Sequence, residues 1–191
     1  MGRPTLVVIS GPPGTGKTTL AHALAGAIPC PAISRDEIKE GMVHAERRPF
    51  EPAPDDPLTR RTFPLFFGVI RLLLAGGVTI VVEAAFQDAR WRPELEPVGE
   101  QAELRIVQCH TDPPVAYRRA AARSEKRRAV SAHADGALPR EVEEWRRRFA
   151  SFERLSLPVP SLDVDTTDGY EPAFAEIVAF ASRCSADGCV P

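Results

Sequence analysis

The chain has 191 residues, 43% of them hydrophobic, which suits a single domain with one continuous core. Its 24 Lys and Arg against 26 Asp and Glu give a net charge of -2, which excludes a general nucleic-acid or membrane-surface binder. No apolar run approaches the roughly 18 to 20 residues that cross a bilayer, and the first residues lack the pattern of a secretory signal. We therefore expect a cytoplasmic protein without a membrane segment.

Short apolar runs rich in β-branched residues alternate with segments of helical length. The runs with the pattern of strands buried on both faces are 5–10, 32–34, 78–83, 104–110 and 161–165. Strands that alternate with helices imply right-handed βαβ crossovers. The pattern predicts an α/β fold with a parallel, doubly wound sheet.

The predicted helices have recognisable starts. Ser34-Arg35-Asp36-Glu37 has the Ser-x-x-Glu form of a capping box, which predicts a helix from Arg35 through Met42. Four of the 19 prolines follow within nine residues, so 43–57 is predicted to be an irregular insertion on the substrate side. A longer helix, about 58–75, is expected to kink at Pro64, and two more helices begin near Pro113 and Pro139.

The segment 11–18 reads GPPGTGKT and matches G-x-x-x-x-G-K-[ST] at every fixed position. It follows a predicted strand and opens a helix, which is the context in which backbone N–H groups and a helix N-terminus cradle phosphates. The motif predicts a purine nucleoside triphosphate with Mg²⁺ as ligand, Lys17 at the β- and γ-phosphates and the Thr18 hydroxyl on the metal. The nucleotide-binding residues predicted here are Gly11, Pro12, Pro13, Gly14, Thr15, Gly16, Lys17, Thr18 and Thr19.

Proteins with this loop either transfer phosphate to an acceptor or hydrolyse it to drive motion or switching. An AAA+ motor has a similar loop, but its third strand ends in an Asp-Glu pair and a helical lid domain follows. Here the strand ends Val82-Glu83-Ala84, and little chain remains for such a domain. Transfer is favoured, while an ATPase or a regulatory nucleotide-binding module that uses no phosphoacceptor stays open.

Asp36 follows the second predicted strand. The carboxyl ends of parallel strands share one edge, so Asp36 is expected to face the crevice of the phosphate loop. A carboxylate there can take the proton of an acceptor hydroxyl as a general base. The alternative is that Asp36 only complements the helix dipole. Lys39, one turn further on, either contacts an acceptor or is solvated.

Four segments in order resemble the small P-loop kinases typified by the polynucleotide 5′-hydroxyl kinase domain, with zeta-toxin-like and chloramphenicol phosphotransferase-like enzymes as relatives. They are GPPGTGKTT, SRDEIKEGM, VVEAAFQDARWR and YRRAAARSEKRR. The resemblance implies a three-layer P-loop fold with five parallel strands in the order 2-3-1-4-5, formed by a single domain over 1–183 with a tail at 184–191. It also implies an ATP- and Mg²⁺-dependent phosphotransferase acting on a hydroxyl group.

The same resemblance assigns roles to residues. It makes Asp36 the general base and Arg35 its neighbour in the family's Arg-Asp pair. The third strand departs from the family's Asp followed by Thr or Asn, because it ends in Glu83, which serves either Mg²⁺ or the acceptor. The residues predicted to bind the acceptor are Arg35, Lys39, Glu83, Phe86 and Arg90.

An arginine-rich stretch is predicted to form a lid over about 118–140. Arg119 and Arg123 lie four residues apart and so share a helix face. In similar kinases such arginines stabilise the charge on the transferring phosphoryl group, and a solvated basic face is the alternative. Thr166 and Thr167, after the last predicted strand, either contact the base or cap the final helix.

The sequence indicates the class of acceptor less clearly than it indicates the nucleotide. Between Arg118 and Arg154 lie 11 basic residues, but six acids are interleaved and few aromatic residues are available for base stacking. The proline-rich insertion and the apolar residues near Phe66 instead favour an enclosed pocket for a small, partly apolar hydroxyl compound. The sequence therefore favours a small-molecule hydroxyl over a nucleic-acid 5′ end, and it indicates no obligate protein partner.

Overall fold

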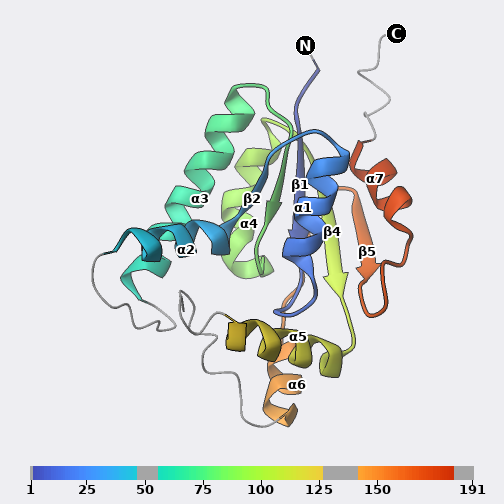
Figure 1. Ribbon diagram of the computed structural model, residues 1–191. Coiled ribbons are helices and arrows are strands. Elements are labelled where there is room, and N and C mark those ends of the chain that lie inside the picture. The colour runs from blue at the N-terminus through green and yellow to red at the C-terminus, as the bar shows by residue number, and fades with distance from the viewer. Residues whose placement is uncertain (1, 47–55, 127–141, 183–191) are drawn as a thin grey trace.

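The computed structural model describes residues 2–46, 56–126 and 142–182, and Figure 1 traces the elements they form. The strands are β1 (Thr5–Ser10), β2 (Ala32–Ser34), β3 (Ile80–Glu83), β4 (Glu103–His110) and β5 (Ser161–Asp165). The helices are α1 (Lys17–Ala27), α2 (Arg35–Ala45), α3 (Pro57–Ala75), α4 (Asp88–Gly99), α5 (Pro113–Lys126), α6 (Val142–Ala150) and α7 (Phe174–Ser182).

All five strands are parallel and form one sheet in the order β2-β3-β1-β4-β5. This confirms the predicted α/β class and the strand order 2-3-1-4-5. In the register, Glu83 of β3 pairs with Ser34 of β2 on one side and with Ile9 of β1 on the other. The ends of these strands therefore lie together at the edge from which the phosphate loop leaves.

Helices cover both faces of the sheet, which makes the three layers (Figure 1). On one face, the alternate β1 residues Leu6 and Val8 pack in a core with α3 and α4. On the other face, Val7 and Ile9 pack against α1 and α7. This alternation is expected of a strand that is buried on both sides.

A separate, smaller cluster joins α5 to α6. It contains the buried Ala116, Ala120 and Trp145, with Tyr117 and Phe149 packed against them. Trp145 and Phe149, four residues apart on α6, thus belong to one packing surface, as expected for apolar residues at helical spacing. The cluster attaches α6 beside the edge that carries the phosphate loop.

Several predicted boundaries shift. Helix α2 runs to Ala45 rather than Met42, so the first residues of the predicted insertion 43–57 are helical, and residues 47–55 lie outside the described residues. Helix α5 continues to Lys126, so the start of the predicted lid is helical, while 127–141 and the tail lie outside the described ranges. Within these ranges, no helix is both long and apolar enough to span a membrane.

Candidate functional site

The phosphate loop owes its shape to glycines. Gly11, Gly14 and Gly16 have φ values of 147°, 84° and 73°, which side chains other than glycine rarely adopt. A Cβ atom on Gly14 would lie 2.4 Å from the carbonyl oxygen of Ala116, and one on Gly11 would lie 2.2 Å from that of Cys109. The loop therefore fits closely against the ends of β4 and α5.

Two side chains of the loop meet at one carbonyl group. Lys17 Nζ donates a hydrogen bond of 2.9 Å to the carbonyl oxygen of Pro12, and Thr15 Oγ1 donates one of 2.8 Å to the same oxygen. Lys17 and Thr15 are both buried, whereas Pro13 and Thr19, also predicted to bind nucleotide, are exposed. Lys17 is therefore folded back on the loop, beside the space that phosphates take in such loops.

Glu83 links the phosphate loop to the second strand. Its Oε2 atom accepts a hydrogen bond of 3.1 Å from Thr18 Oγ1 and one of 2.8 Å from Ser34 Oγ. The Glu83 side chain is buried, with 2% of its surface exposed. A carboxylate and a hydroxyl in contact are the oxygen ligands that Mg²⁺ prefers, so this pair fits the metal predicted at Thr18. The two hydroxyls account for only one of the two carboxylate oxygens.

Asp36 stands at the start of α2, immediately after Ser34 and Arg35. Ser34 caps the helix by accepting a hydrogen bond of 3.5 Å from the Glu37 amide. Arg35 Nη1 donates a hydrogen bond of 3.1 Å to Asp36 Oδ1. The Asp36 side chain is 46% exposed and that of Arg35 only 17%. Asp36 is thus an accessible carboxylate within two residues of the serine that contacts Glu83.

Lys39 is not a solvated cation. Its Nζ donates hydrogen bonds of 2.7 Å to Asp56 Oδ2 and 2.8 Å to Thr59 Oγ1, and its side chain is 3% exposed. Asp56 also caps α3 through the Thr59 amide. Burial raises the pKa of Asp56, but the Lys39 ammonium and the Thr59 hydrogen bonds outweigh it and lower the pKa to about 2. Lys39 therefore ties α2 to α3 and has little surface for an acceptor.

Phe86 and Arg90, which are also predicted to bind the acceptor, differ in their exposure. Phe86 is fully buried and packs against Trp91, with ring centroids 4.7 Å apart, so it belongs to the core and has no surface for direct contact with an acceptor. Arg90 is exposed, and its guanidinium lies 5.6 Å from the centre of the Phe63 ring. Of the two, only Arg90 is accessible.

Arg119 binds the loop that follows β5. It donates hydrogen bonds of 2.8 Å and 3.3 Å to the carbonyl oxygens of Thr166 and Thr167. Thr166 Oγ1 donates in turn to the carbonyl oxygen of Thr15, at 2.9 Å, which connects Arg119 to the phosphate loop. Arg123 lies one helical turn further along α5 and is half-buried. The two threonines serve this connection and do not cap α7.

Sequence reasoning missed two residues of this region. The sequence did not indicate the role of Asp56, because its partner Lys39 is 17 residues away, on the other side of the proline-rich insertion. Its position before Pro57 is nevertheless the sequence signal of a helix N-cap. Ser34 was interpreted only as a cap, and its bond to Glu83 depends on the strand register, which the sequence does not state.

Comparisons with known proteins agree with the fold. The family model described as an AAA domain, AAA_33, matches residues 6–152. A search of curated proteins found no match.

Solved structures of kinases share the fold. A candidate kinase from Chloroflexus aurantiacus is 24% identical with a TM-score of 0.80, covering 93% of this chain and 96% of the other. A gluconokinase from Sinorhizobium meliloti is 20% identical with a TM-score of 0.54, covering 95% and 91%. An APS kinase from Mycobacterium tuberculosis, solved with AMPPNP and APS, is 14% identical with a TM-score of 0.59, covering 96% and 100%.

Proposed function

Because the chain belongs to the AAA_33 family of AAA domains and has the fold of P-loop kinases, we propose that it is an ATP- and Mg²⁺-dependent kinase whose acceptor is a hydroxyl group of a small molecule. The observation that carries the proposal is the contact of Glu83 with both Thr18 and Ser34. This contact joins the phosphate loop to Ser34, the N-cap of the helix whose second residue is Asp36, which supports the accessible Asp36 carboxylate as the group that meets the acceptor.

The loop supplies the donor side. Its glycines allow the backbone N–H groups to face the phosphates, and α1 adds the partial positive charge of its N-terminus. Lys17 exchanges the Pro12 carbonyl for the β- and γ-phosphate oxygens when nucleotide binds. Thr18 and Glu83 would hold Mg²⁺, which would withdraw charge from the phosphate oxygens.

Asp36 acts on the acceptor. Its carboxylate orients the hydroxyl group and takes its proton while the acceptor oxygen forms a bond to the γ-phosphorus. The bond between the γ-phosphorus and the β–γ bridging oxygen breaks, and ADP leaves with that electron pair. Arg35 orients the Asp36 carboxylate through its hydrogen bond to Oδ1.

The arginines of α5 divide into two roles. Arg119 is engaged with the carbonyl groups after β5, so it secures the nucleotide side of the site. Arg123, one turn along, is the arginine that we assign to the transferring phosphoryl group. The assignment of a lid over 118–140 rests on the sequence alone beyond Lys126, because 127–141 lie outside the described residues.

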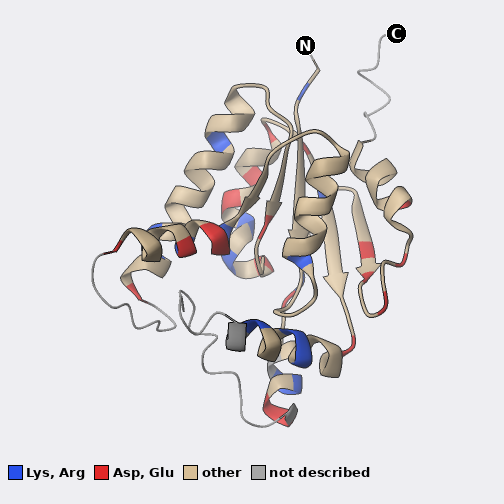
Figure 2. Cartoon of the chain, viewed as in Figure 1, with Lys and Arg blue, Asp and Glu red and all other residues tan. Residues whose placement is uncertain are grey.

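A nucleic-acid 5′ end is the second candidate acceptor. Figure 2 shows basic residues gathered on α5 and α6 beside the phosphate loop, and the structure of a Pnkp1/Rnl/Hen1 complex shares the fold at 18% identity with a TM-score of 0.51, covering 62% of this chain and 40% of the other. Phosphate contacts give a steep decrease of affinity with salt. A shallow salt dependence of single-stranded DNA binding supports the small molecule, and a steep one supports the nucleic acid.

The decisive experiment measures ADP and phosphorylated product with a panel of alcohols, nucleosides and 5′-hydroxyl oligonucleotides. At least one acceptor should raise ADP release above the rate with water alone. Asp36→Asn should lower transfer by about 10²- to 10⁴-fold and leave ATP affinity unchanged. If no acceptor exceeds water, or if Asp36→Asn abolishes ATP binding instead, the proposal is wrong.

Glu37→Gln is the matched control for the base. Glu37 is a carboxylate in the same first turn of α2, and it contacts the exposed His22 rather than the phosphate side. If Asp36 acts only on the helix dipole, both substitutions should have the same small effect. A large loss confined to Asp36→Asn supports proton transfer.

A further inference from the structure

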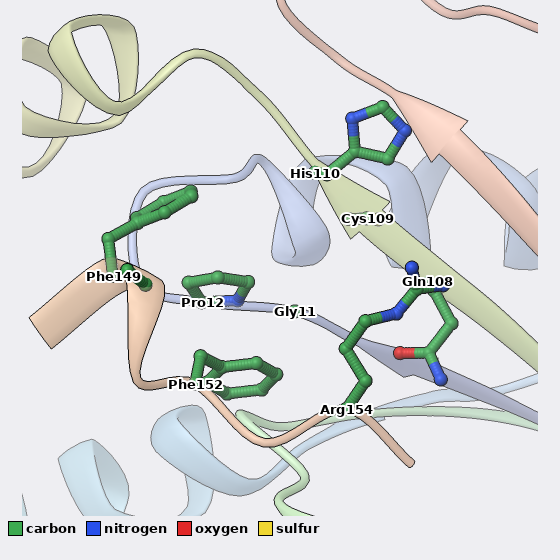
Figure 3. A pocket seen from close by; sticks show the side chains of 9 residues that line it. Gly11, Pro12, Gln108, Cys109, His110, Phe149, Phe152 and Arg154 are labelled. Atoms are coloured by element: carbon green, nitrogen blue, oxygen red, sulfur yellow. The ribbon is translucent and has the colours of Figure 1, made fainter. Parts of the chain in front are cut away.

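A cavity of about 260 Å³ lies between the phosphate loop and the segment that leaves α6. Figure 3 shows its walls, which come from β4, the loop and the end of α6. Its lining includes Gly11, Pro12, Gln108, Phe149, Phe152 and Arg154. None of these residues except the two of the loop belongs to the site described above.

One polar atom in this cavity lacks a partner. Gln108 is buried, with 3% of its surface exposed, and its Nε2 donates a hydrogen bond of 2.8 Å to the carbonyl oxygen of Leu155. This bond fixes which way the carboxamide is turned. The Oε1 atom has no hydrogen-bond partner among the described residues. A buried acceptor left unsatisfied is costly, so Gln108 favours a ligand that brings an N–H or O–H donor.

The rest of the lining combines aromatic and proline rings with the polar residues His110 and Arg154. Figure 3 shows the rings of Phe149, Phe152 and Pro12 on one side and the side chains of Gln108 and Arg154 on the other, with Arg154 between the Gln108 oxygen and Phe152 in this view. Both phenylalanines are only half-buried, so they keep ring surface for a ligand. An apolar cavity of about 150 Å³ is enough for a benzene molecule in another protein, so 260 Å³ accommodates one substituted ring.

The segment with Phe152 is held in place from a second side. The Asp88 carboxylate at the start of α4 accepts a hydrogen bond of 2.7 Å from the Ser156 amide, and Arg92 donates one of 2.6 Å to the Ser156 carbonyl oxygen. With the bond from Gln108 to Leu155, these contacts fix the chain just after Phe152. The cavity wall is therefore preformed, which lowers the entropic cost of binding.

We propose that this cavity binds a small planar ring bearing a hydroxyl or amino donor, and that the ring is part of the phosphoryl acceptor. The placement follows from Pro12, which lines the cavity while its carbonyl oxygen holds Lys17, so a bound ring lies next to the phosphate-binding lysine. Arg119 and Thr166 are not lining residues, and we leave them to the nucleotide, but the two regions adjoin because Thr166 Oγ1 donates a hydrogen bond of 3.2 Å to the carbonyl oxygen of His110, which lines the cavity. The identity of the ring as acceptor rests on the proposed function.

The test uses 3-hydroxybenzyl alcohol, which has a ring, a phenolic donor and a transferable hydroxyl, and 3-methoxybenzyl alcohol, which lacks the phenolic donor. The hydroxy compound should shift the NMR signals of the Gln108 side-chain amide and of Phe152. The methoxy compound should bind about tenfold more weakly because Oε1 stays unpaired. Both should bind alongside the ATP analogue AMPPNP.

Three variants refine the test. Gln108→Leu should bind the two compounds with equal affinity, and Phe152→Ala should weaken both by about tenfold. Leu72→Ala, on the exposed side of α3, is the control and should change neither. If Gln108→Leu does not fold, Phe152→Ala still decides, because unchanged binding in that variant overturns the proposal. Competition between either compound and AMPPNP also overturns it, because the cavity then holds the nucleotide base.

Phosphorylation assays separate this inference from the proposed function. If alcohols are phosphorylated at rates that Phe152→Ala and Gln108→Leu leave unchanged, the inference is wrong and the kinase proposal stands. If the ring compounds bind as expected but no alcohol in the panel is phosphorylated, the kinase proposal is wrong, and with it the ring's role as acceptor. Phosphorylation of 3-hydroxybenzyl alcohol with a KM that rises in both variants supports the two together.

Discussion

On the phosphate side of the site, main-chain geometry holds the parts together: glycines with positive φ, and carbonyl groups that accept from Lys17, Thr15 and Arg119. On the base side, between α2 and α3, side chains do so through the buried pair of Lys39 and Asp56. A phosphate loop built from main-chain groups tolerates few substitutions. It recognises the phosphate groups, which all nucleotides have. Side-chain pairs can be exchanged one by one, so the base side depends on individual residues more than the phosphate side does.

The largest effect is expected from the base side. Lys39→Met leaves the Asp56 carboxylate buried without its cation, which should lower the free energy of unfolding by about 3 to 5 kcal/mol. Chemical denaturation measures this. In a double-mutant cycle, Asp56→Asn keeps the helix cap and removes the charge, so the double variant should lose less than the sum of the two single variants. Additive losses would mean that the two side chains do not depend on each other.

The next effect tests the phosphate loop. In Gly14→Ala the new Cβ meets the Ala116 carbonyl oxygen, so the loop must move, and ATP affinity should fall by at least about 100-fold. Gly26→Ala is the control in the adjoining helix α1, where a Cβ meets nothing within 4 Å. That variant should bind ATP normally. Equal losses in both would show that the helix, and not the loop, is sensitive.

Low pH should also distinguish the two sides, because it removes the stabilising contribution of Asp56 on the base side. The pKa of Asp56 is lowered to about 2, so its contribution of about 2 kcal/mol is present above its usual value near 3.8 and is lost as the pH falls toward 2. Denaturation at pH 5 and pH 2.5 should show a larger loss of stability in the native chain than in Asp56→Asn. An equal loss in both would place the acid sensitivity elsewhere.

The sequence predicted the elements around the phosphate loop well because their patterns are local. The strands and the order of the elements can be recognised from short stretches of sequence, and the sheet confirms them. It predicted the base side less well because contacts there cross the insertion, as Lys39 and Asp56 do. Phe86 was misplaced because its position after β3 suggested the crevice, whereas its ring turns into the core. Gln108 gave no signal, because one polar residue within an apolar strand has many structural uses.

The smallest effect concerns the surface between the two sides. His22 of α1 lies 2.8 Å from Glu37 of α2, and both side chains are about half exposed. Exposed pairs of this kind contribute little, because water screens the charges and the side chains lose freedom, so His22→Ala should change the free energy of unfolding by less than about 0.5 kcal/mol. Transfer activity should also be unchanged. A loss of activity with normal stability would mean that α1 positions Asp36 through Glu37, and the two sides would then be coupled at the surface as well as through Glu83.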